Sequence, residues 1–305
     1  MQDPAGLYTL AGDVEVPPGL VMVEALDGFV DAAGAARLAR QHLLATLDAQ
    51  LVASFDVDQL LDYRSRRPVM VFDRDHWDSY AEPRLDLHLL RDGRGAPFLL
   101  LAGSEPDLQW HRFTTAVTGL VEALGVRLTA GLTAVPMAVP HTRPIGMTVH
   151  ATRRDLLDDS EPWFGRVQVP GSASALLERR LGEAGHDAMG FAVHVPQYLV
   201  QAELPDAAVA LLEAVGAATG LVFPDGALRE AGVRTRVQID AQVERSEEVA
   251  AVVRGLEEQY DAFVRGRGTD LLADPDAELP SGDELGAELE RFLAEHSRRE
   301  DPPQG

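Results

Sequence analysis

The stretch of residues 97–144 constrains the fold more than any other part of the sequence, because it alternates apolar runs with a helical pattern. The first apolar run covers 97–102. Apolar residues then recur at spacings of three and four between Phe113 and Leu124, and a second run covers 127–139. A strand, a helix and a strand in this order form the unit of a parallel sheet. We therefore expect an α/β domain built around this unit.

The helix of this unit is predicted to begin at Ser104. Its hydroxyl can cap the helix, Pro106 would occupy the first turn, and Glu105 would lie near the positive end of the helix dipole. The two flanking strands should end at the same edge of the sheet. Glu105 is therefore expected on the same side of the molecule as His141 and Arg143, which follow the second strand.

Other apolar runs extend the predicted sheet. Strands are expected at 20–26, 51–55, 68–72, 145–151 and 188–195. Helices are expected at 31–49 and at 206–219, and a further helix follows residues 170–174 and runs to about residue 183. Residues 84–90 alternate apolar and polar side chains, and a turn at 92–95 returns the chain to the run that starts at 97. This pattern indicates an antiparallel pair, so the sheet should be mixed rather than purely parallel.

The character of the sequence changes near residue 225. Strand patterns stop there, and charged helical patterns cover 240–265 and 282–297, joined by a linker rich in Gly, Pro and Asp. The chain is accordingly divided into a core domain at 1–225, a helical region at 226–300 and a disordered tail at 301–305. The sequence leaves open whether the helical region is a separate unit or a lid over the edge of the sheet.

Charge and composition exclude several classes of function. The 305-residue chain has 49 acidic and 27 basic residues, a net charge of -22, so binding to nucleic acid is not expected. It has no cysteine and no lysine, which excludes disulfides, thiolate nucleophiles and lysine Schiff bases. No apolar run approaches the roughly 20 residues that span a bilayer, and the acidic N-terminus is unlike a signal peptide. A cytoplasmic protein without membrane contact is predicted.

Polar residues near the ends of the predicted strands form a candidate ligand pocket: Asp56, Ser104, Glu105, His141, Arg143 and Tyr198. An imidazole beside a carboxylate can act as a general base, and an arginine with a helix N-terminus can hold an anion. A purely structural alternative stays open. Glu105 can cap a helix, and His141 can fill a packed turn. Arg143 can pair with Asp56 or Glu105 as an internal brace.

No complete catalytic signature accompanies these residues. The nine histidines contain no HExxH pattern, so no metal site is expected. Residues 266–268 lack the third glycine of a dinucleotide fingerprint, and 171–174 lack the GxSxG spacing of a nucleophile elbow. Neither a catalytic residue nor a cofactor is therefore predicted.

Several sequence blocks are more specific in combination than each is alone. They are Ser54–Asp56 with Leu60–Pro68, Gly103–Pro106 with Trp110 and Phe113, Pro140–Pro144, and Val195–Tyr198. Together they resemble the proteasome-assembly-chaperone family, in particular its bacterial branch common in actinobacteria. The resemblance covers about residues 20–225 and, more loosely, the helical region.

The resemblance implies a three-layer α/β/α core with a mixed, mostly parallel sheet, similar to nucleoside phosphorylases, followed by a helical segment. It also implies self-association, and relatives in eukaryotes and archaea bind proteasome subunits rather than catalyse a reaction. The leading hypothesis is a non-enzymatic, self-associating interaction protein, with the proteasome or another protein complex as partner. The alternative is an enzyme or ligand-binding protein that holds an anionic or nucleoside-like molecule with Glu105, His141 and Arg143.

Overall fold

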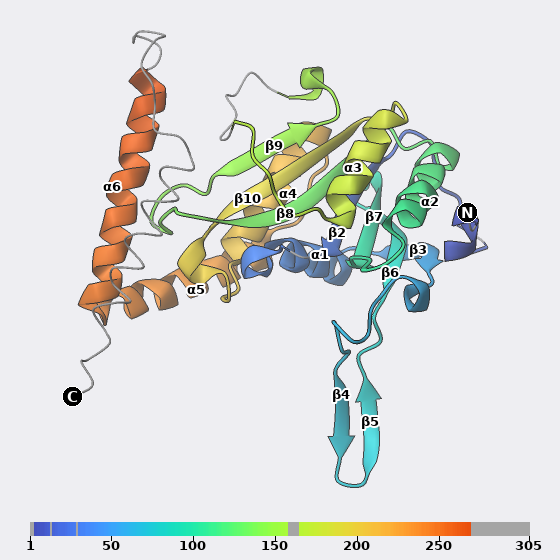
Figure 1. The fold of residues 1–305 in the computed structure, drawn as a ribbon, viewed down its shortest axis with the longest axis horizontal. Coiled ribbons are helices and arrows are strands. Elements are labelled where there is room, and N and C mark those ends of the chain that lie inside the picture. The colour runs from blue at the N-terminus through green and yellow to red at the C-terminus, as the bar shows by residue number, and fades with distance from the viewer. Residues whose placement is uncertain (1–2, 13, 29, 158–164, 270–305) are drawn as a thin grey trace. The chain divides into compact units, whose positions relative to one another are not determined.

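The computed structural model of this chain describes residues 3–12, 14–28, 30–157 and 165–269, with side chains described as far as residue 265 (Figure 1). Its contacts divide the chain into two compact units. The first comprises residues 1–162 and 169–257, and the second comprises 163–168 and 258–305. All the described strands belong to the first unit.

A mixed sheet forms the centre of the first unit, with the strand order β1-β3-β6-β7-β2-β8-β10-β9. The strands are β1 (Tyr8–Leu10), β2 (Val21–Asp27), β3 (Ala49–Phe55), β6 (Leu85–Arg91), β7 (Pro97–Ser104), β8 (Leu128–Met137), β9 (Met147–Ala151) and β10 (Ala188–Pro196). β7, β2, β8 and β10 are mutually parallel, and β3 runs with them because both β3 and β7 are antiparallel to β6. Five of the eight described strands of this sheet therefore share one direction, which confirms a mixed, mostly parallel sheet.

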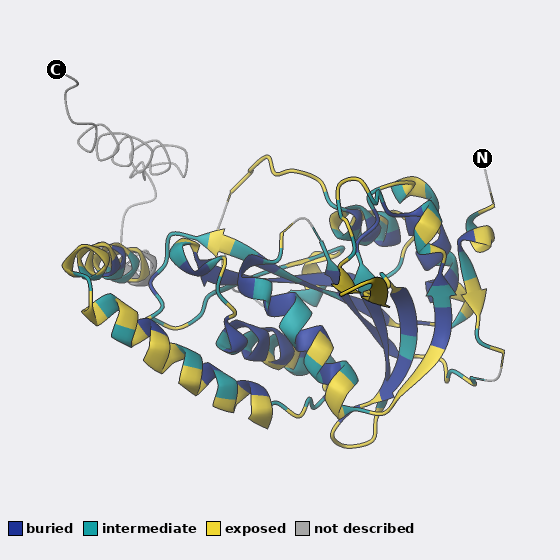
Figure 2. Ribbon diagram, turned by 90° about the horizontal axis from the view of Figure 1, so that it is seen from below, coloured by how far each residue is buried: buried dark blue, intermediate teal, exposed yellow. Residues whose placement is uncertain are grey.

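Helices cover both faces of the sheet. The helices are α1 (Ala35–Thr46), α2 (Trp110–Ala123), α3 (Ala173–Glu183), α4 (Pro205–Thr219), α5 (Gly226–Glu244) and α6 (Glu247–Thr269), with short 3₁₀ turns at Pro4–Leu7, Ala32–Gly34, Val57–Gln59, Arg154–Leu156 and Gln197–Leu199. α1 and α4 pack on one face, and α2 and α3 pack on the other. In Figure 2 the strands between them are mostly buried, while the helices expose their outer sides. The predicted three-layer α/β/α architecture is confirmed.

The apolar run that begins at Pro97 is continuous because both faces of β7 are covered. Phe98 and Leu100 belong to the core cluster that includes α1 and α4, whereas Leu99 and Leu101 belong to the cluster that includes α2 and α3. All four side chains are fully buried. Since burying one such side chain contributes about 1.5–3 kcal/mol, β7 is a main source of the stability of the sheet.

The predicted helix start at Ser104 is wrong. Ser104 is the last residue of β7, and α2 begins at Trp110, after a left-handed Gln109 with a φ of 57°. The backbone between them is held by loop contacts, because the amide of Asp107 donates a hydrogen bond to the carbonyl of Leu60. With Ser104 as the cap, the first intrahelical hydrogen bond would come from the amide of Leu108, but this amide also donates to the carbonyl of Leu60. The segment therefore does not form a helical turn, although its sequence has the pattern of a cap.

The strand expected at 68–72 does not join the main sheet. It forms β4 (Met70–Asp73), which pairs with β5 (His76–Tyr80) in a separate two-stranded ribbon that extends away from the sheet (Figure 1). The sequence pattern missed β5 because HWDSY contains neither an apolar run nor a clear alternation. Every residue from 69 to 82 is exposed.

The described part of the C-terminal region, residues 226–269, is helical, as predicted, but its first helix begins earlier than the pattern indicated. α5 starts at Gly226 and is separated from α6 by residues 245–246, whereas the sequence pattern predicted a helix over 240–265. α5 packs against α4 and belongs to the first unit. The helix expected at 282–297 and the tail at 301–305 lie outside the described residues, and the domain boundary at 225 stays a prediction. No described helix is long and apolar enough to cross a membrane.

Candidate functional site

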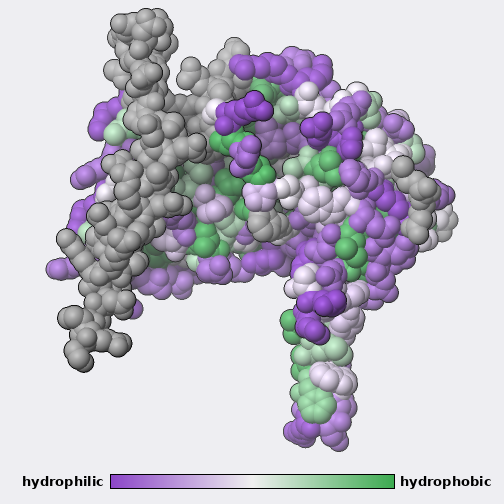
Figure 3. Space-filling view, viewed as in Figure 1, coloured by the Kyte–Doolittle hydropathy of each residue, from purple (hydrophilic) through white to green (hydrophobic). Residues whose placement is uncertain are grey.

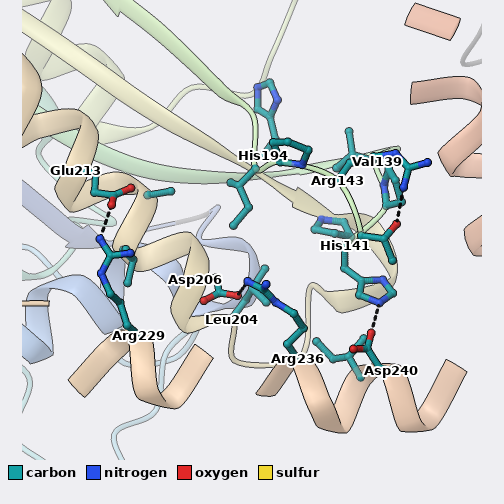
Figure 4. Close-up of a pocket in the computed structure, with 18 residues that line it drawn as sticks. Val139, His141, Arg143, His194, Leu204, Asp206, Glu213, Arg229, Arg236 and Asp240 are labelled. Atoms are coloured by element: carbon teal, nitrogen blue, oxygen red, sulfur yellow. Dashed lines mark hydrogen bonds and ion pairs between the residues drawn. The ribbon is translucent and has the colours of Figure 1, made fainter. Parts of the chain in front are cut away.

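A cavity of about 560 Å³ lies at the carboxyl ends of β8 and β10 (Figure 4). Its walls come from residues 139–145 after β8, from β10, from α4 and from α5. His141 and Arg143 line it, and Tyr198, which follows β10, contacts His141 directly. Three of the six candidate residues therefore meet here. They meet because β8 and β10 are parallel neighbours, so the segments that follow them begin at one edge of the sheet.

The His141 ring is fixed on both of its nitrogens. The phenol oxygen of Tyr198 lies 2.6 Å from Nδ1 and 2.8 Å from the backbone nitrogen of His141. The backbone N–H donates to this oxygen, and Nε2 of the ring lies 3.1 Å from Oδ1 of Asp240. Burial raises the pKa of the Tyr198 hydroxyl, which keeps it protonated at neutral pH. The imidazole, whose side chain is 5% exposed, is therefore held in one orientation.

The arginines that line the cavity all have acidic partners. The ion pairs are Arg143–Glu257 at 3.2 Å, Arg236–Asp206 at 2.5 Å, Arg229–Asp225 at 2.7 Å, and Arg229–Glu213. Two of these pairs join α5 to α4 (Figure 4). Another joins the segment after β8 to α6. The acidic partners of these arginines outnumber the guanidinium groups, and an anionic ligand would have to compete with the carboxylates for them.

His194 of β10 is a wall residue that the sequence analysis missed. It is 1% exposed, and burial lowers its pKa to about 4, so the imidazole is neutral at physiological pH. Its Nε2 lies 2.7 Å from the Thr148 hydroxyl on β9. A histidine inside an otherwise apolar strand is the signal that could have identified it. Arg236 and Asp240 of α5 gave no such signal, because they look like the solvated face of a charged helix.

The other three candidates do not line this cavity. Asp56 is exposed after β3, and Ser104 ends β7. Glu105 is buried, with 4% exposure, and its Oε1 accepts hydrogen bonds from the backbone nitrogens of Ala173 at 2.6 Å and Ser174 at 3.4 Å. Glu105 therefore binds the N-terminus of α3, on the face of the sheet that α2 and α3 cover.

These features define a three-layer α/β protein with a strand-end cavity bordered by α5 and with an exposed ribbon. Among the residues with described side chains, no group of three or more His, Asp or Glu is placed to hold a metal ion. The sequence profile of the PAC2 family matches residues 25–243, and the chain belongs to the PAC2 family.

Solved structures agree with this assignment. A Mycobacterium tuberculosis protein of unknown function is 53% identical, with a TM-score of 0.85 over 88% of this chain and 92% of its own. A Corynebacterium glutamicum protein of unknown function is 41% identical, with a TM-score of 0.81, and the match covers 85% of this chain and 98% of that protein. A Mycobacterium tuberculosis proteasome-assembly chaperone homologue is 25% identical, with a TM-score of 0.70, and the match covers 77% of this chain and 100% of that protein. The predicted relationship to this family is confirmed. No curated protein matches the chain.

Proposed function

We propose that the protein is a non-enzymatic interaction protein that associates with itself and binds other proteins in the cytoplasm. Its membership of the PAC2 family supports this, as does its similarity to a homologue of proteasome-assembly chaperones. The observation that carries the proposal is the β4–β5 ribbon, because an apolar surface of this kind is typical of a protein contact.

The apolar side of the ribbon consists of Met70, Phe72, Trp77 and Tyr80. Met70 is paired with Tyr80, and Phe72 with Trp77, whose rings meet edge to face with centroids 5.1 Å apart. The four residues are 46%, 55%, 63% and 48% exposed, in that order. Figure 3 shows apolar residues along the ribbon, below the more hydrophilic surface near its base.

Covering this side would be favourable for two reasons. An isolated two-stranded ribbon is only marginally stable in water, so a partner that packs on it also stabilises the ribbon. Aromatic residues and methionine are enriched at the centres of protein interfaces. Since Phe72 and Trp77 are each roughly half exposed, burying both would contribute about 2–3 kcal/mol to binding.

The net charge of the chain opposes self-association at long range, because two copies that each carry a charge of -22 repel each other. Arg64 and Arg67, exposed in the segment that leads into β4, reduce this repulsion locally. A contact between two copies must therefore draw its free energy from the apolar side of the ribbon.

Site-specific photo-crosslinking in cells tests the proposal. A p-benzoylphenylalanine residue at the position of Trp77 should yield a product of twice the 33.0 kDa chain mass, together with products of other proteins. The matched control carries the same residue at the position of Val233, which is 64% exposed on α5, against 63% for Trp77. If the Trp77 position gives no product, or no more than the Val233 position, the proposal is wrong.

A second candidate function is the binding of an anionic or nucleoside-like molecule in the cavity beside His141 and Arg143. The hydrogen-bonded chain from Tyr198 through His141 to Asp240 favours it, because an oriented imidazole can exchange a proton with a ligand. Phosphate, nucleosides and nucleotides should be screened by thermal shift against the wild type and His141→Ala. A ligand that raises the Tm of the wild type alone supports this function. If no ligand shifts either protein, this function is rejected.

A further inference from the structure

A row of four residues crosses the sheet on the face that α2 and α3 cover. Glu24 of β2 is in register with Gly131 of β8, Gly131 with Gly190 of β10, and Gly190 with His150 of β9. Residues directly opposite each other in adjacent strands project from the same face of a sheet. Two titratable side chains therefore stand at the ends of the row, with two glycines between them.

The glycines leave room for these side chains to lie over the sheet. A Cβ atom at Gly131 would come within 2.9 Å of Oε2 of Glu24, and one at Gly190 would come within 2.0 Å of the His150 ring. Any larger residue at either position would displace the acid or the imidazole. The row is thus shaped so that Glu24 and His150 occupy the space above the strands.

α3 lies over this row and contacts both side chains. The Ser174 hydroxyl is 2.5 Å from Oε1 of Glu24, and Oε1 of Glu178 is 2.9 Å from Nδ1 of His150. Ser174 and Glu178 are four residues apart, so they lie on one side of the helix. We call the four residues Glu24, His150, Ser174 and Glu178 the α3 seam.

Glu24 is the buried acid of the α3 seam, with 3% exposure. Burial raises its pKa to about 7, the hydrogen bond with Ser174 acts in the opposite direction, and the carboxylates of Glu105 and Glu178 raise it further. The strands on either side of β2 present Leu101 and a glycine, which carry no charge. The groups that face Glu24 are therefore one hydroxyl and two acids.

His150 supplies the positive charge of the α3 seam. Its hydrogen bond with Glu178 raises the pKa of the imidazole, against the effect of partial burial. When both His150 and Glu24 lose their protons, three carboxylates, those of Glu24, Glu105 and Glu178, remain beside a neutral ring. Loss of the Glu24 proton leaves a buried charge beside two acids, and this cost outweighs the stronger hydrogen bond from Ser174. Loss of the His150 proton removes the charge that Glu178 pairs with. Both deprotonations thus weaken the attachment of α3, although Glu105 still accepts the hydrogen bond from the backbone nitrogen of Ala173.

We propose that the α3 seam is a latch that holds the first turn of α3, residues 173–176, on the sheet while Glu24 is neutral and His150 is charged, and that loosens when both protons are lost. The rest of the helix stays attached, because Leu177 and Leu181 are fully buried in the core cluster that includes α2. For an acid whose pKa is raised in the folded state, the favourable contact is complete at low pH and is lost as the pH rises through about 7. The change is local and independent of the proposed function.

Hydrogen exchange of the native protein at pH 6 and pH 8, corrected for the intrinsic exchange rate, tests the latch. The protection of residues 173–176 in the wild type should fall by about tenfold between the two pH values, since Glu24 has a pKa of about 7 when buried and an ordinary one when released. Glu24→Gln, which stays neutral, should keep its protection at pH 8. Glu230→Gln is the matched control, because it removes one exposed carboxylate from α5, away from α3, and should behave like the wild type.

Three results would overturn the latch. The first is equal protection of α3 at both pH values in the wild type, and the second is a loss of protection in Glu24→Gln as large as in the wild type. The third is an equal loss in β2 and β8, which would mean a global rather than a local effect. If Glu24→Gln does not fold, Ser174→Ala gives the same test. It removes a hydrogen bond that favours ionised Glu24, so the transition should move to higher pH, and an unchanged or lower midpoint would contradict the latch.

Discussion

Asp92 connects the turn between β6 and β7 to the segment between α4 and α5. Its Oδ1 accepts hydrogen bonds from the backbone nitrogens of Arg94 at 2.9 Å and Ala96 at 2.8 Å. Its Oδ2 accepts one from the backbone nitrogen of Val222 at 2.9 Å. The residue is 6% exposed. Asp92→Ala would leave these three amides without their charged acceptor.

The cost follows from the number and kind of bonds lost. A hydrogen bond to a charged group contributes about 1.5–3 kcal/mol, but the two turn amides can partly rehydrate, so we expect Asp92→Ala to lower the free energy of unfolding by about 3–4 kcal/mol. Asp92→Asn keeps one acceptor oxygen and should cost about 1–2 kcal/mol. Both losses are large beside a typical total stability of about 5–15 kcal/mol.

The pH dependence of this contribution has a definite sign. Burial alone would raise the pKa of Asp92, but the backbone N–H groups of Val222, Ala96 and Arg94 outweigh it and lower the pKa. The stabilisation is therefore present above the unfolded-state pKa near 3.8 and is lost as the pH falls through the lower folded-state value. The difference in the free energy of unfolding between the wild type and Asp92→Asn should shrink as the pH falls over that range.

Urea unfolding at pH 7 measures these effects. Asp75→Ala is the matched control, because Asp75 is an aspartate of the ribbon whose side chain is 90% exposed, and it should change stability by less than about 0.5 kcal/mol. If Asp92→Ala unfolds within about 1 kcal/mol of the wild type, the three hydrogen bonds do not support the junction as argued.

Three further substitutions have expected outcomes. Glu24→Gln should raise the free energy of unfolding at pH 8 by about 3 kcal/mol and leave it nearly unchanged at pH 4, because the pKa of Glu24 rises from 4.5 to about 7 on folding. A gain of equal size at both pH values, measured by urea titration, would argue against this. Gly103→Ala should destabilise by about 3 kcal/mol or more in thermal unfolding, since φ is 136° and a Cβ would lie 2.0 Å from the carbonyl oxygen of Arg84. Arg66→Lys should lower the free energy of unfolding by about 2 kcal/mol, since the guanidinium binds both Asp107 and the carbonyl of Asp27. A decrease below about 0.5 kcal/mol in urea unfolding would show that these two hydrogen bonds are dispensable.

The elements that the sequence predicted well are those whose faces are uniformly buried. β7 reads as an unbroken apolar run because both of its faces are covered, and α4 reads as a helix because its inner face is apolar throughout. The two-stranded ribbon was missed in part because no core imposes a periodicity on exposed residues such as His76 to Tyr80. The start of α2 was misplaced because contacts with a distant loop, such as that of Asp107 with Leu60, are not visible in local sequence.

The candidate site was predicted only where topology alone decides proximity. His141, Arg143 and Tyr198 came together because parallel neighbours end at one edge. Their partners Asp240 and Glu257 come from helices about 100 residues further along the chain, and no local pattern announces such pairs. Glu24 did carry a signal, since a carboxylate inside the apolar segment LVMVEAL is unusual and could have been singled out.

Sedimentation velocity over a range of protein concentrations tests the central claim, self-association through the ribbon, most directly. The wild type should sediment as an oligomer, whereas the double variant Phe72→Ser/Trp77→Ser should sediment as a 33.0 kDa monomer with unchanged circular dichroism. Val71→Ser, on the opposite side of the ribbon and 47% exposed, should remain oligomeric. A wild type that sediments as a monomer, or a double variant that stays as large as the wild type, would contradict the account.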